Sequence, residues 1–328
     1  MSENLMEVKH LKKYFETPKG MLHAVDDVTF SIGKGKTMGV VGESGCGKST
    51  LGRTLIHLYE STDGQIFFNG EDITHVHKHK LHQLREQMQI KKEYWKGIQA
   101  IFQDPFASLN PRMTVEETIR EPLELSGKFK KGELSDETDR IMEMVGIDER
   151  LRYAYPHELD GGRRQRVGIG RALALDPAFV VCDEPVSALD VSIQAQVLNL
   201  LQDLQEKSGV TYMFVTHDLS VVKHISDNIC VMYLGQLVET TTSKELFDRP
   251  LHPYTKALLS AIPSVDIHHQ KQRIILKGEI VSPIEPKPGC RFAARCPYAT
   301  EKCHQPQELR EVSKDHFVSC CRVEEINS

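Results

Sequence analysis

Short apolar runs alternate with amphipathic helical stretches over most of the chain. Alternating apolar and polar positions, many of them β-branched, predict strands between residues 6 and 40. The run AFVVC at 178–182 is apolar throughout, as expected for a central parallel strand buried on both faces. Residues 191–208 have strong helical spacing, and Gly209 marks the expected end of that helix. Strands and helices that alternate in this way predict an α/β sheet.

The same pattern predicts several smaller elements. Residues 64–74 resemble a hairpin with its turn at Asn69-Gly70. Residues 97–102 form a further predicted strand, and residues 114–150 carry helical periodicity with many charges, which indicates an inserted helical subdomain. From about residue 250 the chain is rich in Pro, His and Cys, and we expect a separate tail there.

Composition and charge narrow the classes of function. The 328 residues have ordinary globular composition, and a net charge of -5 gives no electrostatic case for binding nucleic acid. No stretch reaches the apolar length needed to cross a bilayer. The polar start MSENLMEVKHLKKYF lacks the apolar run of a secretory signal. We therefore expect a cytosolic chain that reaches any membrane through a partner.

Residues 42–50, GESGCGKST, fit the phosphate-loop pattern G-x-x-x-x-G-K-[ST] between a predicted strand and a predicted helix. Glycines let backbone N–H groups turn inward around phosphates, and the helix points its positive end at them. Lys48 is expected to reach the β and γ phosphates and Ser49 to ligate Mg²⁺, whereas Cys46 is interpreted as a small filler. The predicted nucleotide-binding residues of the loop are Gly42, Glu43, Ser44, Gly45, Cys46, Gly47, Lys48, Ser49 and Thr50.

Two acidic residues follow the predicted strand at 178–182. Asp183 and Glu184 come at its carboxyl end, where open α/β sheets bind their ligands. Asp183 is suited to hold Mg²⁺, and Glu184 is suited to act as general base on an attacking water. An acidic pair is weak evidence alone, but this one follows a phosphate loop with the required elements between.

Five of the eight cysteines lie in the last 39 residues. In a cytosolic chain such a cluster favours a metal over disulfides. Four thiolates suit either tetrahedral Zn²⁺ or an iron–sulfur cluster, and the spacing lacks the CxxC pairs of common zinc modules. The candidate ligands are Cys290, Cys296, Cys303 and Cys320, with Cys321 as a spare.

Read together, these motifs resemble the ATPase domain of ABC transporters over roughly residues 6–250. The resemblance implies a P-loop NTPase fold of the α/β class: an ABC-type ATPase core with an antiparallel β subdomain and a helical subdomain. It places the nucleotide-binding domain at 1–250, the helical subdomain at about 104–175, and a small Cys-rich extension at 251–328. The implied activity is ATP hydrolysis coupled to transmembrane transport, the translocase class of enzymes.

Further residues take their roles from this resemblance. Gln103 in IFQDP looks like the Q-loop, which senses Mg²⁺ and contacts the membrane subunit. His217 in VTHD looks like the switch histidine that contacts the γ-phosphate, and Phe15 is the implied aromatic on adenine, with Tyr14 the alternative. The implied catalytic set is Glu184, His217 and Gln103, and the implied Mg²⁺ set is Ser49, Gln103 and Asp183. The implied signature and D-loop residues at the dimer interface are Asp160, Gly161, Gly162, Arg163 and Asp190.

The resemblance also implies partners. Two such ATPase subunits pair head to tail, and each ATP lies between the phosphate loop of one and the signature of the other. Two transmembrane permease subunits and an extracytoplasmic substrate-binding protein complete an importer. Residues 103–150 are the implied docking surface for the permeases, which places the chain at the cytoplasmic face of the membrane.

The signature departs from the family pattern. Residues 159–163 read LDGGR where the family has LSGGQ, so Asp160 replaces a serine that donates its hydroxyl to the γ-phosphate. An ionised carboxylate donates no hydrogen bond and repels the phosphate, at a cost of several kcal/mol at about 4 Å. Arg163 either neutralises Asp160 or faces the phosphates itself. We therefore expect an asymmetric heterodimer in which the site that uses LDGGR is weak, unless Asp160 is protonated or turned away.

A second departure precedes Gln103. REQMQI at 85–90 already resembles the strand that leads to the Q-loop, and we interpret residues 75–96 as an enlarged His- and Lys-rich surface segment.

The tail narrows the transporter class. LHPYTKALLSAIPSV at 251–265 resembles the extension of oligopeptide and dipeptide importers, as does the stretch EIVSPIEPKPGCRFAARCPYATEKC. In that branch the cysteines can carry a [4Fe-4S] cluster, which would hold the Pro-rich tail; Zn²⁺ is the alternative, and free thiols are the third reading. Oligopeptides are the family default, importers of oligosaccharide or nickel are alternatives, and a soluble ABC ATPase without a transport role is another.

Overall fold

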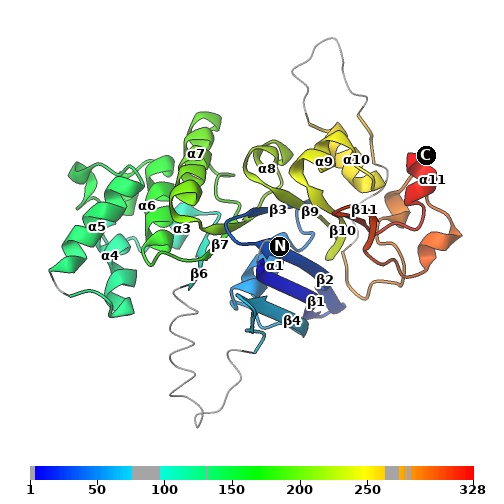
Figure 1. Cartoon of the computed structure of the whole chain (residues 1–328), viewed down its shortest axis with the longest axis horizontal. Helices are drawn as coiled ribbons and strands as arrows, with labels where there is room; N and C mark the ends of the chain where they lie inside the picture. Colours follow the sequence, from blue (N-terminus) through cyan, green and yellow to red (C-terminus); the bar gives the residue numbers. More distant parts are fainter. Residues whose placement is uncertain (1–3, 76–96, 131, 263–272, 277, 279–281) are drawn as a thin grey trace, which may run out of the picture. The chain divides into compact units, whose positions relative to one another are not determined.

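A computed structural model describes residues 4–75, 97–130, 132–262, 273–276, 278 and 282–328 (Figure 1). The chain forms two compact units, and it passes from the first into the second within strand β8 (Thr211–Val215). The first, which we call the helical unit, is built mainly of residues 75–213. The second, which we call the β-rich unit, holds residues 3–32, 36–74 and 214–328. The predicted extension at 251–328 thus belongs to the same unit as residues 42–50.

One sheet of the β-rich unit is antiparallel and has the strand order β2-β1-β4-β5. Its strands are β1 (Asn4–Thr17), β2 (Gly20–Gly33), β4 (Asp63–Phe68) and β5 (Glu71–Asp72). The predicted hairpin is confirmed in β4 and β5, because Asn69 (φ 52°) and Gly70 (φ 81°) both adopt the left-handed conformation that a tight turn requires.

The second sheet of this unit runs in the order β11-β12-β10-β9-β3. Strand β3 pairs in parallel with β9, and the pairs that follow are antiparallel. These strands are β3 (Thr37–Val41), β9 (Asn228–Tyr233), β10 (Gln236–Thr242), β11 (Arg310–Ser313) and β12 (His316–Val318). The helices of the unit are α1 (Lys48–Leu55), α8 (Leu219–Ile225), α9 (Ser243–Asp248), α10 (Pro253–Ser260) and α11 (Val323–Asn327). The last two strands in chain order come from the extension, so the extension lengthens this sheet.

Aromatic packing joins the extension to the core of the β-rich unit. The Phe292 ring lies 5.3 Å from that of Tyr233 in β9 and 5.4 Å from that of Tyr254 in α10. All three side chains are buried in a cluster that also contains Val41, the last residue of β3. The tail therefore does not lack core contacts, and its identity as a separate Cys-rich module is not confirmed.

A buried carboxylate makes a second connection. Glu239 in β10 accepts hydrogen bonds from the backbone N–H groups of Leu251 (2.7 Å) and His252 (2.9 Å). Its Oε1 also lies 2.7 Å from Nε2 of His316 in β12, and both side chains are fully buried. A buried carboxylate is tolerated only when such partners satisfy it. Glu239 thus fixes the start of the extension and its strand β12 against the same strand.

The helical unit contains the predicted buried strand. Strand β7 (Phe179–Asp183) is buried at all five positions and pairs in parallel with β6 (Ile98–Ile101). Helix α7 (Val191–Ser208) ends at Gly209, whose φ of 70° forms a left-handed cap, as predicted. The other helices are α3 (Pro105–Ser108), α4 (Val115–Ser126), α5 (Glu133–Met144) and α6 (Gly161–Leu173).

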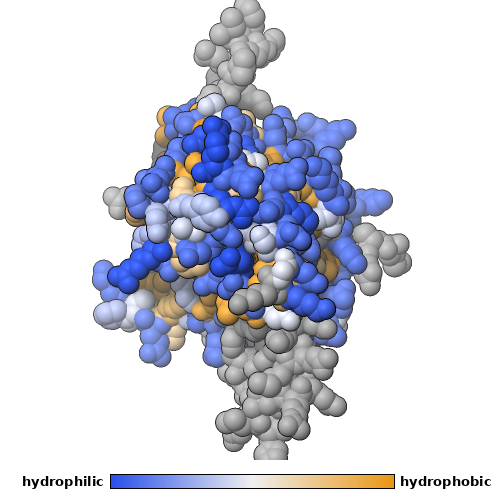
Figure 2. Space-filling view, turned by 90° about the vertical axis from the view of Figure 1, so that its left-hand side faces the viewer, coloured by the Kyte–Doolittle hydropathy of each residue, from blue (hydrophilic) through white to orange (hydrophobic). Residues whose placement is uncertain are grey.

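The surface on the α4 and α5 side is mainly hydrophilic, with apolar side chains scattered among polar ones (Figure 2). Large apolar residues that are exposed in the helical unit include Leu125 and Tyr153, at 78% and 72%. Among the described residues, no helix is long and apolar enough to cross a bilayer. The His- and Lys-rich segment lies outside the described residues from position 76 to 96.

Burial of His252 predicts a pH-dependent stability. Burial lowers the pKa of His252 to about 4, from an ordinary value of about 6.5. Between these pH values the unfolded chain binds a proton that the folded chain does not. The free energy of unfolding should therefore fall as pH drops from about 6.5 towards 4.

The variant His252→Asn isolates this contribution. His252 Nδ1 caps α10 by accepting the N–H of Tyr254, and asparagine is a good cap that does not titrate. Urea unfolding at pH 7.5 and 5.0 should show a smaller loss of stability for His252→Asn than for the wild type. The exposed His304→Asn serves as control and should behave as the wild type. Equal pH dependence of His252→Asn and wild type would contradict the assignment.

Candidate functional site

The predicted site residues are divided between the two units. The β-rich unit holds the predicted loop 42–50, Phe15, His217 and the extension cysteines. The helical unit holds Gln103, Asp183, Glu184, the signature and the D-loop. Within each unit the structure gives the geometry of these residues directly.

The loop at 42–50 lies between β3 and α1, the strand and helix that its motif requires. Gly47 has a φ of 105°, and a Cβ there would lie 2.0 Å from the carbonyl oxygen of Ala24. A Cβ on Gly42 would lie 2.1 Å from the carbonyl oxygen of Met232. The loop backbone therefore packs so closely on its surroundings that only glycine fits at these two positions.

The ammonium group of Lys48 is buried inside this loop. Its Nζ donates to the carbonyl oxygens of Gly42 (2.8 Å) and Glu43 (3.0 Å). The Cys46 thiol is buried beside it, and burial raises the pKa of Cys46. A buried, protonated thiol is a poor nucleophile, which agrees with its interpretation as a filler.

His217 lies close in space to the start of the loop. It is the second residue after β8, and the N–H of its neighbour Thr216 donates to the carbonyl oxygen of Val40 in β3 at 3.2 Å. Val40 lies two residues before Gly42, so the structure brings His217 to the strand edge from which the loop leaves. The exposed position of His217 suits a side chain that contacts a ligand.

The two candidates for the adenine contact differ in their surroundings. The Tyr14 hydroxyl donates to Asp26, and its ring stacks on His23 at 3.9 Å. The Phe15 ring makes an edge contact with Tyr59 at 5.4 Å and lies beneath the ammonium group of Lys13. Because the contacts with Asp26 and His23 already hold Tyr14, Phe15 is the better candidate for the adenine contact.

Strand ends in the helical unit bring Gln103 and Glu184 together. Ile101 of β6 pairs with Cys182 of β7, so the residues after both strands lie at the same edge. The side-chain amide of Gln103 donates to Oε2 of Glu184 at 2.9 Å. Glu184 has a φ of 49°, which is uncommon for a side chain of this size and is typical of functional sites.

Glu184 is also connected to the D-loop. Its carbonyl oxygen accepts hydrogen bonds from the backbone N–H (3.3 Å) and the hydroxyl (3.1 Å) of Ser187. Asp190, at the end of this turn, caps α7 by accepting the N–H of Ile193 at 3.0 Å. Asp183 is buried beside Glu184 at the end of β7. Three predicted motifs thus converge on the end of one strand.

The signature residues form the start of α6. Asp160 is the N-cap, and its Oδ1 accepts the backbone N–H of Arg163 at 2.8 Å. Its other oxygen lies 3.3 Å from Nε of Arg163, and both side chains are more than half exposed. The sequence left two roles open for Arg163, neutralising Asp160 or facing the phosphates. In the structure Arg163 pairs with Asp160.

The extension cysteines gather in one region. Burial and the neighbouring thiols of Cys320, Cys303 and Cys296 raise the pKa of Cys290 to about 12. Burial and neighbouring thiols also raise the pKa values of Cys296 and Cys320. Among the described residues, however, no group of three or more His, Cys, Asp or Glu is arranged to hold a metal ion. The thiol donors are near one another, but the predicted metal site is not confirmed.

Two residues of the extension that the sequence did not single out contact the loop. The Tyr254 hydroxyl accepts the backbone N–H of Glu43 at 2.9 Å, and Arg295 pairs with the Glu43 carboxylate at 2.7 Å. No local pattern indicates either contact, because more than 200 residues separate the partners in the sequence.

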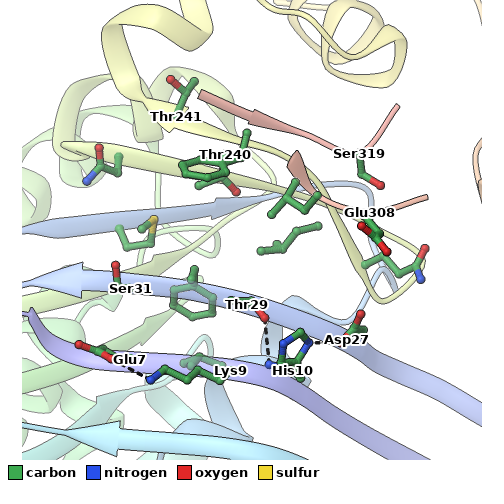
Figure 3. Close-up of a pocket in the computed structure, with 18 of the residues that line it drawn as sticks. Glu7, Lys9, His10, Asp27, Thr29, Ser31, Thr240, Thr241, Glu308 and Ser319 are labelled. Carbon is green, nitrogen blue, oxygen red and sulfur yellow. Dashed lines mark hydrogen bonds and ion pairs between the residues drawn. The ribbon is translucent and has the colours of Figure 1, made fainter. Parts of the chain in front are cut away.

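A separate pocket of about 800 Å³ lies in the β-rich unit (Figure 3). It is lined from several strands, and four of its side chains form two pairs, Lys9 with Glu7 and His10 with Asp27. None of the predicted site residues lines it. This pocket is therefore not the predicted nucleotide site.

Comparison with known proteins gives two family matches and many relatives. Residues 25–187 match the family described as ABC transporter, and residues 238–303 match the C-terminal region of oligopeptide/dipeptide transporters. Two relatives from Bacillus subtilis are the oligopeptide transport ATP-binding proteins AppF, 48% identical over 97% of both chains, and OppF, 49% identical over 99% of this chain and 98% of the relative.

Solved structures agree on the fold. The cbiO1 protein of Clostridium perfringens, part of an ABC transporter complex, matches with a TM-score of 0.64 and 26% identity over 75% of this chain and 92% of that one. A dimeric ATP-binding cassette with bound ADP and Pi matches with a TM-score of 0.63 and 26% identity over 73% of this chain and 98% of that one. The chain therefore belongs to the ABC transporter family of ATP-binding proteins, in the branch that carries the oligopeptide/dipeptide transporter C-terminal region.

Proposed function

We propose that this chain hydrolyses ATP to drive the uptake of oligopeptides or dipeptides through partner permeases at the cytoplasmic face of the membrane. The observation that carries the ATPase part is the convergence of Gln103, Glu184 and the D-loop turn on the end of β7. The peptide part is supported by the relatives named for oligopeptide transport and by the matched C-terminal region. A second ATPase subunit, two permeases and a substrate-binding protein are the partners that this function requires, with residues 103–150 as the permease-docking surface.

Each part of the phosphate loop has a defined task in this proposal. The tightly packed loop presents its backbone N–H groups to the phosphates, and Lys48 adds a positive charge that is already held in the loop. Phe15 stacks on the adenine ring. Ser49 and Asp183 offer hard oxygen ligands of the kind that Mg²⁺ prefers, and a bound Mg²⁺ would neutralise phosphate charge.

The hydrolytic step requires a base at a fixed position. Glu184 accepts a proton from the attacking water, and the Gln103 amide fixes the direction of that carboxylate. His217 follows β8 at the same strand edge as the loop and is suited to contact the γ-phosphate. The chain thus supplies charge, orientation and a proton acceptor, which are the main needs of phosphoryl transfer.

Glu184→Gln tests the ATPase assignment. The variant should bind MgATP with an affinity close to that of the wild type, because an amide keeps the shape of the side chain. Its turnover in the assembled transporter should fall at least about a hundredfold, since the amide accepts no proton. Phosphate release and nucleotide binding are the two measurements, and Glu206→Gln, at an exposed position of α7 outside the proposed site and docking surface, is the control. Unchanged turnover would refute the assignment.

We propose further that the chain works in an asymmetric pair with a second ATPase subunit. The carboxylate of Asp160 occupies the position where the family has a serine hydroxyl, and Arg163 offsets only part of its charge because both side chains are solvent-exposed. A signature of this kind repels the γ-phosphate of the nucleotide bound to the partner. The composite site that uses LDGGR is therefore the weaker of the two.

Asp160→Ser is a matched test because serine and aspartate are equally good helix caps. Helix α6 should keep its stability, while the repulsion is removed and a hydroxyl donor is added. ATP turnover of the assembled pair should rise severalfold over wild type. Asp248→Ser, at an exposed position outside the signature and the proposed docking surface, should leave turnover unchanged. The asymmetric pair is excluded if Asp160→Ser turns over ATP at the wild-type rate.

The cysteine cluster carries a third proposal: Cys290, Cys296, Cys303 and Cys320 hold a [4Fe-4S] cluster of structural role, with Zn²⁺ as the alternative. One supporting observation is that the backbone N–H of Cys290 donates to the carbonyl oxygen of Cys303 at 2.8 Å. The other is that the neighbouring thiols of Cys320, Cys303 and Cys296 contribute to the raised pKa of Cys290. A four-thiolate donor set fits either metal by its chemistry.

Metal analysis after anaerobic purification separates these cases. An iron–sulfur protein should be brown, contain about four irons per chain, and lose both properties in Cys303→Ser. Cys230→Ala, which removes a buried thiol of β9 outside the cluster, should keep them. A colourless protein with one zinc per chain would show that the cysteines bind Zn²⁺ and no iron–sulfur cluster. A metal-free protein would exclude both metals.

A further inference from the structure

Glu43, the second residue of the phosphate loop, is held by the C-terminal extension at two points. The Arg295 guanidinium donates to both carboxylate oxygens, at 2.7 and 3.1 Å. The Tyr254 hydroxyl accepts the Glu43 backbone N–H at 2.9 Å. The Arg295 side chain is only 9% exposed and that of Glu43 22%, so water competes weakly for this pair. Two-pronged pairs of this type fix orientation as well as position.

The third polar group of Glu43 faces the loop interior. Its carbonyl oxygen accepts a hydrogen bond from Lys48 Nζ at 3.0 Å, next to the bond from the same nitrogen to the Gly42 carbonyl. A continuous path of hydrogen bonds therefore leads from Arg295 and Tyr254 through Glu43 to the Lys48 ammonium. A shift of Glu43 would move one of the two acceptors that position this charge.

The same short segment of the extension contacts a second part of the site. Arg291 pairs with Asp26 and donates to the carbonyl oxygen of Leu234. Asp26 in turn accepts the Tyr14 hydroxyl, and Tyr14 precedes Phe15, the candidate for the adenine contact. Three residues separate Arg291 from Arg295, and Phe292 among them is buried in the core. The segment is therefore anchored, and it presents one arginine to Asp26 and the other to Glu43.

We propose that Arg295 and Tyr254 are positioning residues of the nucleotide site, which hold Glu43 so that Lys48 is placed for the phosphates. This inference rests on the proposed role of residues 42–50 as the nucleotide loop. It makes the extension a working part of the ATP site. The extension acts on nucleotide affinity through Glu43 and touches no reacting atom.

Equilibrium binding of MgATP to the full-length chain tests the inference. Arg295→Met keeps the apolar stem of the side chain and removes its charge. Its dissociation constant for MgATP should rise roughly tenfold, the size expected when a charge-assisted hydrogen bond that orients a group is lost. Tyr254→Phe removes one hydroxyl and should give a smaller increase, and Arg295→Lys should restore binding in part, because it keeps the charge and loses the fork.

A double-mutant cycle shows whether Arg295 acts through Glu43. Glu43→Gln combined with Arg295→Met should bind MgATP no more weakly than the weaker single variant. Arg310→Met is the control, because Arg310 also pairs with a carboxylate on the exposed surface of the extension: its Nη2 donates to both oxygens of Glu324, at 2.8 and 2.9 Å. It should bind MgATP as the wild type does. In the assembled transporter, Arg295→Met should raise KM and leave kcat within about twofold.

Lys48→Ala separates failure of this inference from failure of the nucleotide site itself. If Lys48→Ala binds MgATP as the wild type does, the site assignment is wrong. If Lys48→Ala loses binding while Arg295→Met and Tyr254→Phe keep it, the site stands and the positioning role is refuted. Additive losses in the double-mutant cycle would also refute it, since they show that Arg295 acts independently of Glu43. Thermal unfolding of each variant without nucleotide verifies that the chain is folded.

Discussion

The contact among Phe292, Tyr233 and Tyr254 is the packing on which the arrangement of the β-rich unit depends. These rings lie in one buried cluster with Val41, the residue from which the phosphate loop departs. Aromatic side chains bury a large area and pack with defined geometry. The cluster therefore fixes α10 and the segment around residue 292 relative to the loop, and the polar contacts of Tyr254 and Arg295 become possible only because these elements are held there.

Local patterns in the sequence predicted much of this fold. The buried run at 178–182, the helix that ends at Gly209 and the turn at Asn69-Gly70 all form where expected, because strand burial, helix capping and tight turns depend on neighbouring residues. The sequence motifs also predicted the ABC transporter family and the oligopeptide-type C-terminal region, and both family matches confirm this. The roles assigned to individual site residues remain proposals.

The contacts that the sequence could not predict join residues far apart in the chain. Glu43 and Arg295 are 252 positions apart, and Glu239 meets His316 across 77. Neither pair has a local signal, since an arginine in a Pro-rich tail reads equally well as a solvated charge. The sequence predicted a separate tail from about residue 250, and the burial of Phe292 in the core of the β-rich unit was not predicted. The metal was predicted from the clustering of cysteines and from the resemblance to the importer branch, and the described residues contain no group arranged to hold one.

The environment of Glu239 limits how the extension can be truncated or exchanged between related proteins. The partners of this buried carboxylate come from residues 251, 252 and 316, so a chain cut after β10 would leave a charge without compensation inside the protein. A graft of the extension from a relative would have to supply equivalent donors and suitable mates for Glu43 and Asp26. We therefore expect the nucleotide-binding domain and the extension to be inherited together during evolution and not to be exchanged separately between relatives.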